Sequence, residues 1–310
     1  MAGTLYATLY RLNFWETEKR IKVLNFQSVK GVIKKRLIKN FTKHVLLPEE
    51  WERIGDAREF IHSYLEFGQD HDEKWVMTEI NNGIRIFVDI MDCGVSRHIL
   101  FSTFEKQETE LISSLLKPGS VFCDIGANVG WYTLQASEWV GEDGKVFSFE
   151  PGPSSFQALS NSVEQNGCKN VRLYNVALSD NPGEEILGRP EGQRNTGGSF
   201  LGSNRGVLVK LETLDRVLLD VDRLDLIKMD VEGWEPNIIK GGRKLIQKFK
   251  PYIVSEISEE FLRNRQSLTS EAYIGSLKDM GYRCFDIETM EEISACSPGR
   301  PHINALFRPD

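Results

Sequence analysis

Long apolar runs are missing from this chain of 310 residues. No stretch approaches the run of about 18 apolar residues that crosses a bilayer as a helix, and the first residues lack the basic and then apolar order of a signal peptide. We therefore expect no transmembrane span and a cytoplasmic location. The length favours one sheet-based domain with an N-terminal extension.

Cysteine is also scarce, with five residues at positions 93, 123, 168, 284 and 296. They form no Cys-x-x-Cys pair and their number is odd, which excludes a disulfide framework and a cysteine-based zinc site. Cys123 lies in a predicted buried strand and should act as a small hydrophobic residue. We expect all five thiols to be reduced and non-catalytic.

Positive charge is in deficit overall, with a formal net charge of −7. This acidity argues against a nucleic acid as the main substrate. The segment from Arg11 to Lys43 is an exception, with ten basic and two acidic residues. Apolar residues between 29 and 45 recur at helical spacing there. Such a helix either packs on its own domain with a solvated basic face, which we favour, or makes peripheral contact with an anionic membrane surface.

A nucleotide-binding pattern starts at residue 121. Val121–Ile125 is a short, mostly apolar run, typical of a strand that is buried on both faces of a parallel sheet. Gly126 and Gly130 bracket a turn, where glycine allows positive φ and the close approach of a ligand. Asn128 is a candidate cap for a helix that starts near Val129. A strand, a glycine turn and a helix in this order predict a doubly wound nucleotide fold.

Two carboxylates suggest which nucleotide binds. Glu150 ends the next strand, where an acidic side chain can accept hydrogen bonds from both ribose hydroxyls. The turn lacks the Gly-x-Gly-x-x-Gly spacing that cradles a pyrophosphate. Asp124, next to the turn, would repel a pyrophosphate but attract an ammonium group. The pattern therefore favours S-adenosylmethionine over NAD, and an NAD-dependent oxidoreductase is the less favoured alternative.

The rest of the chain alternates between strand and helix, which predicts an α/β fold. Predicted strands are a strand after the turn at 81–83, a short one near 97–101, then 171–176, 208–211, 224–230, 252–257, and an antiparallel edge pair at 282–287 and 303–307. Predicted helices are 104–116, 154–165, 214–219, 232–249 with an interruption at Gly241-Gly242, and 270–280. Residues 188–206 are rich in Gly, Asn and Arg and predict a loop, a candidate lid or acceptor-binding element.

With these segments placed, the chain resembles the FkbM family of S-adenosylmethionine-dependent methyltransferases. The matching motifs are Asp124-Ile-Gly-Ala-Asn-Val-Gly-Trp-Tyr-Thr, Phe149-Glu-Pro, Asn175-Val-Ala-Leu-Ser-Asp, Leu211-Glu-Thr-Leu-Asp, Ile227-Lys-Met-Asp-Val-Glu-Gly-Trp-Glu and Lys240-Gly-Gly. The resemblance covers roughly residues 83 to 308. We predict an N-terminal extension over residues 1–80 and a methyltransferase domain over 81–310, with its sheet core from about residue 117.

The resemblance implies a Rossmann-like, class I methyltransferase sheet of seven mostly parallel strands with an antiparallel edge strand. It also implies the site residues. The methionine portion of the cofactor would lie against Asp124, Gly126, Ala127, Asn128 and Gly130, the ribose against Glu150, and the adenine against Asn175, Val176 and Ala177. Asp230 would lie between cofactor and acceptor. Trp234 stands where the family more often has a small residue, so we expect a changed acceptor pocket.

Members of this family typically methylate hydroxyl groups on sugars or natural products, and some are thought to methylate amide nitrogen. An acceptor needs in-line placement and a base, for which Asp230, Glu232 and Glu256 are the candidates. The alternatives are that Asp230 holds the cofactor's amino group or caps a helix, or that the acids bind Mg²⁺ to orient a diol. A non-catalytic, membrane-associated module is a further alternative. His98 and His302 lie alone in the sequence and are expected to be structural.

Overall fold

The computed structural model describes residues 75–89, 92, 94–100, 104–189 and 195–310. The chain divides into two units, Met1–His71 and Asp72–Asp310, and all described residues belong to the second. The boundary predicted near residue 80 falls within a hairpin of this second unit. The basic helix predicted between residues 29 and 45 lies outside the described residues.

The described part opens with a hairpin of β1 (Trp75–Glu79) and β2 (Arg85–Asp89), joined at a short 3-10 turn over Asn81–Gly83. The turn and β2 confirm the prediction from the sequence, whereas β1 was not predicted. Helix α9 (Pro153–Gln165), which was predicted, packs on β2.

The strand that we predicted near residues 97–101 is wrong, because Val95–Leu100 forms helix α6. A buried carboxylate explains the difference. Asp92 accepts hydrogen bonds from the backbone N–H groups of Gly94 (3.1 Å) and Ser96 (2.8 Å). These N–H groups at the start of a helix have no partner within it, so the side chain of Asp92 stabilises the helical conformation over the extended one.

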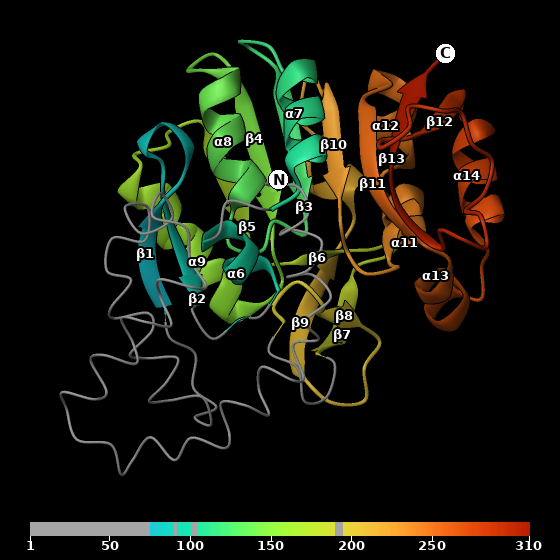
Figure 1. Ribbon diagram of the computed structural model, residues 1–310, viewed down its shortest axis with the longest axis horizontal. Helices are drawn as coiled ribbons and strands as arrows, with labels where there is room; N and C mark the ends of the chain where they lie inside the picture. Colours follow the sequence, from blue (N-terminus) through green and yellow to red (C-terminus); the bar gives the residue numbers. More distant parts are fainter. Residues whose placement is uncertain (1–74, 90–91, 93, 101–103, 190–194) are drawn as a thin grey trace, which may run out of the picture. The chain divides into compact units, whose positions relative to one another are not determined.

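Seven strands form the central sheet (Figure 1), in the order β12-β13-β11-β10-β3-β4-β5. They are β3 (Val121–Ile125), β4 (Lys145–Phe149), β5 (Val171–Tyr174), β10 (Leu226–Met229), β11 (Tyr252–Ser258), β12 (Tyr282–Asp286) and β13 (His302–Pro309). All neighbouring pairs are parallel except those of β13, which is antiparallel to both β11 and β12. The predicted sheet is therefore confirmed, and its antiparallel strand lies one place in from the edge.

Helices cover the sheet. They are α7 (Lys106–Leu115), α8 (Trp131–Val140), α9, α11 (Glu235–Gly241), α12 (Arg243–Phe249), α13 (Glu259–Gln266) and α14 (Ser270–Lys278). Helix α8 packs on β3 and β4, α13 on β11 and α14 on β12. The break between α11 and α12 occurs at Gly242, as the glycine pair predicted. Helix α13 was not predicted.

A smaller sheet follows β5 in the chain, with strand order β6-β9-β7-β8. Its strands are β6 (Ala177–Leu178), β7 (Gly183–Gly188), β8 (Phe200–Leu201) and β9 (Val207–Glu212), and helix α10 (Leu214–Val217) comes after them. Part of the predicted loop over residues 188–206 therefore belongs to this sheet.

The core lies along the central sheet. Phe147, Ile227, Ile253 and Phe307 are at most 2% exposed and belong to one apolar cluster. Each such side chain contributes about 1.5–3 kcal/mol on burial. The four described cysteines form no disulfide, and burial raises the pKa of the Cys123 thiol. Among the described helices, none combines the length and the apolar character needed to cross a membrane.

Candidate functional site

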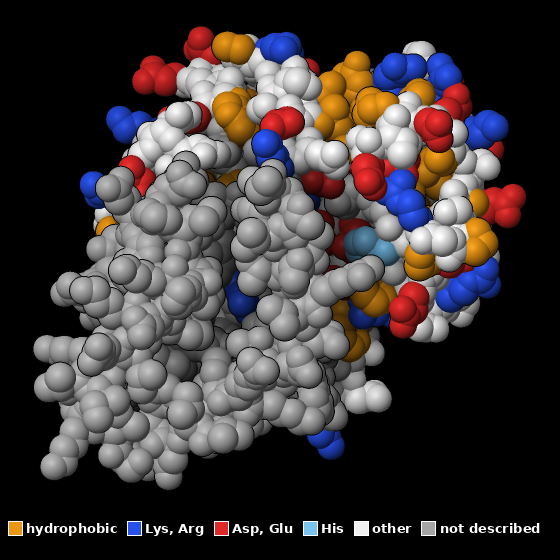
Figure 2. All heavy atoms as spheres, in the orientation of Figure 1, with side chains coloured by type: hydrophobic (Ala, Val, Ile, Leu, Met, Phe, Trp, Pro, Cys, Tyr) orange, Lys and Arg blue, Asp and Glu red, His pale blue; other side chains and the backbone are white. Residues whose placement is uncertain are grey.

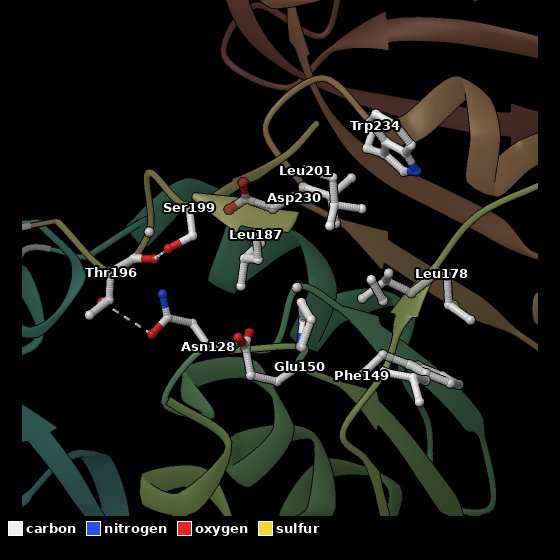
Figure 3. Close-up of a pocket in the computed structure, with 17 residues that line it drawn as sticks. Asn128, Phe149, Glu150, Leu178, Leu187, Thr196, Ser199, Leu201, Asp230 and Trp234 are labelled. Atoms are coloured by element: carbon white, nitrogen blue, oxygen red, sulfur yellow. Dashed lines mark hydrogen bonds between the residues drawn. The ribbon is translucent and has the colours of Figure 1, made fainter. Parts of the chain in front are cut away.

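A pocket lies at the carboxyl ends of β3, β4 and β10, between the central sheet and the smaller sheet. Figure 3 shows side chains of Asn128, Glu150 and Asp230 around it, together with residues of the 196–201 segment. Loops at the carboxyl ends of parallel strands form the ligand sites of doubly wound folds. Of the predicted cofactor residues, those that line the pocket are Gly126, Asn128, Glu150, Val176, Ala177 and Asp230.

Glu150 follows the last residue of β4 and is 8% exposed. Its Oε2 accepts a hydrogen bond from the backbone N–H of Asn128 (2.8 Å), and its Oε1 accepts one from Gly152 (2.7 Å). Burial raises the pKa of Glu150 to about 7, while these two hydrogen bonds oppose the rise. Each carboxylate oxygen keeps a second lone pair, so the side chain can still accept hydrogen bonds from a ligand.

The glycine turn is shaped by protein contacts as well as by the pocket. A Cβ on Gly126, whose φ is +80°, would lie 2.0 Å from the carbonyl oxygen of Asp230. A Cβ on Gly130, whose φ is +99°, would lie 2.5 Å from Leu159. These glycines therefore let the end of β10 and helix α9 approach the turn. Gly130 and Ala127 are not among the residues that line the pocket.

The capping role predicted for Asn128 is wrong. Helix α8 starts at Trp131, and the residue at its N-cap is Gly130. Asn128 has a φ of +49°, and its Oδ1 accepts a hydrogen bond of 3.3 Å from the hydroxyl of Thr196. The side chain of Asn128 is thereby turned toward the 196–201 segment (Figure 3), and away from the helix N-terminus.

Asp124 also departs from its prediction. Its carboxylate is completely buried beneath the turn and does not line the pocket. Oδ2 accepts a hydrogen bond of 2.6 Å from Thr133, and burial raises the pKa of Asp124 against the opposing charge of Lys228. Asp124 alternates with Cys123 and Ile125 along β3, and helix α8 covers it. The side chain of Asp124 therefore lies beneath the pocket, whereas we expected it to point into the pocket toward the ligand.

The side chain of Asn175 supports the part of the pocket where we expect the adenine, but it lies outside the pocket lining. Its Nδ2 donates hydrogen bonds to the backbone oxygens of Glu150 (2.8 Å) and Pro151 (3.2 Å). It does not line the pocket, unlike Val176 and Ala177, which follow it. Asn175 thus holds the turn after β4 in place, and the apolar contacts come from its neighbours.

The 196–201 segment is fixed by a side chain far away in the sequence. Asp92 accepts hydrogen bonds from the backbone N–H (3.0 Å) and the hydroxyl (3.0 Å) of Thr196. Thr196, Gly197, Ser199 and Leu201 line the pocket. The glycine-rich region that we predicted as a lid or acceptor element therefore contributes a wall of the site.

Three carboxylates lie together beside the pocket. Oxygen atoms of Asp230, Glu232 and Glu256 are all within 4.8 Å of one another. Asp230 follows β10, and its backbone N–H donates to the oxygen of Ile125, while Glu256 lies on the neighbouring strand β11. Adjacent parallel strands end at the same edge of a sheet, so the predicted grouping of these acids is confirmed. Only Asp230 of the three lines the pocket itself.

Each of these carboxylates has a basic neighbour. Lys228 Nζ lies 3.2 Å from Asp230, and Arg265 Nη1 lies 3.8 Å from Glu232. Arg265 also donates to the backbone oxygen of Glu232, and its guanidinium stacks on Phe200 and Phe261. Burial alone would lower the pKa of Lys228, but the surrounding carboxylates, led by Asp230, raise it.

The third basic neighbour is His302, which the sequence led us to expect as a lone structural residue. In the structure it has a partner, because His302 Nε2 lies 3.2 Å from Glu256 Oε1. This hydrogen bond raises the pKa of His302 above 6.5. This pair joins strands β11 and β13, and no short sequence motif could have indicated it. On the face of the molecule that Figure 2 shows, histidine and acidic side chains lie side by side.

Burial is the largest cause of the raised pKa values of the glutamates in this cluster. It raises the pKa of Glu232 to about 8, with further contributions from Glu256 and Asp230. It also raises the pKa of Glu256, against the hydrogen bond from His302. Glu235, which is 2% exposed and accepts from the backbone N–H groups of Val231 and Gly233, has its pKa raised to about 8 for the same reason.

The donor set fits Mg²⁺ poorly. Magnesium binding needs ionised oxygen ligands and tolerates few nearby cations. Here Asp230, Glu232 and Glu256 are already next to Lys228, Arg265 and His302 respectively. The alternative in which these acids bind Mg²⁺ therefore has no support in these contacts.

The cofactor fits better. Glu150 offers hydrogen-bond acceptors, and Val176, Ala177 and Phe149 offer the apolar wall that a nucleoside needs. Trp234 lines the same pocket and donates a hydrogen bond of 3.2 Å to Ser179. The sheet order and this pocket define a class I S-adenosylmethionine-dependent methyltransferase domain.

Comparison with known proteins identifies the family. The methyltransferase FkbM domain matches residues 124–284, and the chain belongs to this family. This match argues against the alternative of an NAD-dependent oxidoreductase, because the family consists of S-adenosylmethionine-dependent methyltransferases.

Two curated relatives and a crystal structure are similar to the chain. The 2-O-methyltransferase NoeI of Sinorhizobium fredii is 27% identical over 181 residues, which are 52% of this chain and 72% of NoeI. The hexuronic acid methyltransferase AglP of Haloferax volcanii is 25% identical over 155 residues, which are 48% of this chain and 62% of AglP. The crystal structure of methyltransferase FkbM from Methylobacillus flagellatus aligns with a TM-score of 0.40 at 19% identity, over 68% of this chain and 52% of that chain.

Proposed function

We propose that this protein transfers the methyl group of S-adenosylmethionine to a hydroxyl group of a neutral sugar or glycan. The observation that carries the proposal is the position of Asp230, which lines the cofactor pocket and also belongs to the carboxylate cluster. A hydroxyl-rich acceptor bound by these acids would therefore lie next to the methyl donor. The names of NoeI and AglP, a 2-O-methyltransferase and a hexuronic acid methyltransferase, support a sugar acceptor.

The cofactor residues follow from the pocket. Glu150 would accept hydrogen bonds from the ribose hydroxyls, and Val176 and Ala177 would contact the adenine. Gly126 and Asn128 would lie against the methionine portion. Ala127, Gly130 and Asn175 would act through the turns that they support, and Asp124 would act through its hydrogen bond to Thr133 of helix α8. When bound, the cofactor supplies an electrophilic methyl group.

The carboxylate of Asp230 in the pocket wall favours a neutral sugar over a hexuronic acid. Asp230, Glu232 and Glu256 lie within 4.8 Å of one another, and Glu235 is close enough for its pKa to be raised by Glu256. Another carboxylate about 5 Å from an ionised one costs about 3 kcal/mol at an effective dielectric constant of 20. Lys228 and Arg265 offset part of this cost. We therefore expect carboxylates to accept hydrogen bonds from acceptor hydroxyls here.

A methyl-transfer assay with a matched pair of acceptors tests this proposal. The full chain is incubated with radiolabelled S-adenosylmethionine and either methyl glucopyranoside or methyl glucopyranosiduronic acid, which differ by one carboxylate. Methyl glycosides of galactose and fucose, and amino sugar glycosides, complete the panel. We expect alkali-stable methyl ether formation, with kcat/KM at least about tenfold higher for neutral members than for the uronic acid. Preferential methylation of the uronic acid or of an amino group would contradict the proposal.

Asp230→Asn separates the two roles that we considered for Asp230. If Asp230 positions the acceptor or assists proton transfer, the variant should lower kcat more than the affinity for S-adenosylmethionine. If it holds the cofactor's amino group, calorimetry should show the larger effect on cofactor binding. Asp180→Asn, an exposed acid outside the pocket, is the matched control.

A further inference from the structure

His302 is the first residue of β13, at the same end of the sheet as the pocket. In the antiparallel register, Ser258 lies opposite His302 and Glu256 lies opposite Asn304. Residues two apart on a strand share a face, so the side chains of His302 and Glu256 are diagonal neighbours on one face. The 3.2 Å contact between Nε2 and Oε1 follows from this register.

Acidic groups from three segments face this imidazole. Glu256 comes from β11, Asp230 from the end of β10, and Glu232 from the turn that follows. Each of them raises the pKa of His302, the hydrogen bond to Glu256 most of all. A positive charge that forms on the ring would therefore be stabilised by its surroundings.

The neighbouring acids are less available to take up the proton. Burial raises the pKa of Glu232 to about 8, so this side chain is mostly protonated at neutral pH, and Oε1 of Glu256 is engaged by Nε2 of His302 at 3.2 Å. Asp230 is held by Lys228 at 3.2 Å. The side chain of His302 is 52% exposed, whereas those of Glu232 and Glu256 are 15% and 14% exposed. A proton accepted by His302 can therefore leave to solvent.

We propose that His302 is the general base of the methyl transfer, with Glu256 as the residue that positions its ring. The inference rests on the proposed function. With Nε2–H donating to Glu256, Nδ1 carries the lone pair that faces the acceptor hydroxyl. The O–H bond breaks, its proton goes to Nδ1, and its electron pair forms the new O–CH₃ bond. The C–S bond breaks with its electrons left on sulfur, which gives S-adenosylhomocysteine and then an imidazolium that loses its proton to water.

The first experiment needs no acceptor. Nitrogen-15 NMR of the full chain with S-adenosylhomocysteine reports the protonation of each imidazole nitrogen, and His302→Gln assigns the resonances among the five histidines. We expect neutral His302 to carry its proton on Nε2 and to titrate above 6.5. In Glu256→Gln, the titration should move to lower pH because the carboxylate no longer stabilises the imidazolium. A neutral ring protonated on Nδ1 would overturn the proposal.

The second experiment measures kcat against pH with the best neutral glycoside of the panel. Since the base must be neutral, wild-type kcat should rise with pH through the titration of His302. His302→Gln keeps an N–H donor for Glu256 but removes the base, so kcat should fall at least about 100-fold and lose this rise. Glu256→Gln should keep the rise but shift it to lower pH. His98→Gln, which changes an exposed histidine away from the pocket, should match the wild type.

The results distinguish failure of the inference from failure of the proposed function. A wild-type chain that methylates no glycoside refutes both the acceptor class and the catalytic step. If the wild type is active and His302→Gln stays within about threefold of it with the same pH profile, only the role of His302 is refuted. A loss of activity in His302→Gln that leaves the pH-dependent rise intact would indicate a structural role and would equally overturn the proposal.

Discussion

Glu150→Gln should weaken cofactor binding by removing one carboxylate oxygen from a site that uses both. In the wild type, Oε2 accepts from the N–H of Asn128 at 2.8 Å and Oε1 accepts from that of Gly152 at 2.7 Å. Glutamine has a single oxygen, so its amide NH₂ must face one of these N–H donors. A hydrogen bond to a charged group contributes about 1.5–3 kcal/mol. Loss of one such bond to the ribose therefore predicts an affinity that is about 10–150 times lower.

The assay is calorimetric titration with S-adenosylhomocysteine at pH 6 and pH 8, with thermal unfolding as a check of the fold. Because burial raises the pKa of Glu150 to about 7, wild-type Glu150 is mostly protonated at pH 6 and mostly ionised at pH 8. Wild-type affinity should therefore increase from pH 6 to pH 8, whereas that of Glu150→Gln should change much less. A folded Glu150→Gln protein that binds as tightly as the wild type at pH 8 would refute the assignment of the ribose to Glu150.

Three further predictions concern stability and the walls of the site. Glu235→Gln should gain stability relative to the wild type as pH rises from about 4.5 to about 8, because the pKa of Glu235 is raised to about 8 in the folded state and the unfolded chain loses the proton first. Urea unfolding at pH 5.5 and 8.5 should show a relative gain of a few kcal/mol in the free energy of unfolding. The same difference between variant and wild type at both pH values would contradict the prediction. Gly126→Ala should destabilise far more than Gly119→Ala, since both positions have φ near +80° but only at Gly126 would the Cβ meet backbone, and similar unfolding midpoints would disprove this. Asp92→Asn should raise the KM for S-adenosylmethionine several-fold, although Asp92 does not line the pocket, because an amide would replace a buried carboxylate that accepts two hydrogen bonds from Thr196. An unchanged KM would show that other contacts hold the 196–201 segment in place.

The strands of the central sheet were predictable because burial on both faces leaves a strong local pattern. Val121–Ile125 was predicted with its observed bounds. Glu150 and Asp230 were predicted as the last residues of their strands, and in the structure each lies directly after its strand. A parallel strand between two layers of helices is apolar at most positions, and such a run can be recognised without knowing its partners. The helix interruption at Gly241-Gly242 was equally local.

Features that depend on distant partners were missed. Strand β1 is partly exposed and pairs only with β2, so its sequence carries little burial pattern. Helix α6 depends on Asp92, and the 196–201 segment depends on the same carboxylate, which is 104 residues away from Thr196. The side chain of Asp124 was expected in the pocket because its neighbour in the sequence is the glycine turn. The alternation of side chains along β3 instead places it under helix α8.

The pairing of His302 with Glu256 shows the same limit most clearly. Forty-six positions separate the two residues in the sequence, and a shift of β13 by one residue would turn His302 to the opposite face of the sheet. The register is set by the apolar residues Ile303, Ala305 and Phe307, which must face the core cluster. The core therefore determines which polar residue of β13 meets the carboxylates, although neither the histidine nor the acids contribute to that choice.

The raised pKa values of the buried acids make the site less negatively charged than the amino-acid composition suggests. A formal net charge of −7 counts every acid as ionised. Burial raises the pKa of Glu232 and Glu235 to about 8, so at neutral pH these two side chains are mostly protonated. Asp230 and the imidazole of His302 then face a site with less negative charge than the sequence shows. The remaining acids stabilise the imidazole when it becomes charged, as a general base requires once it has accepted a proton.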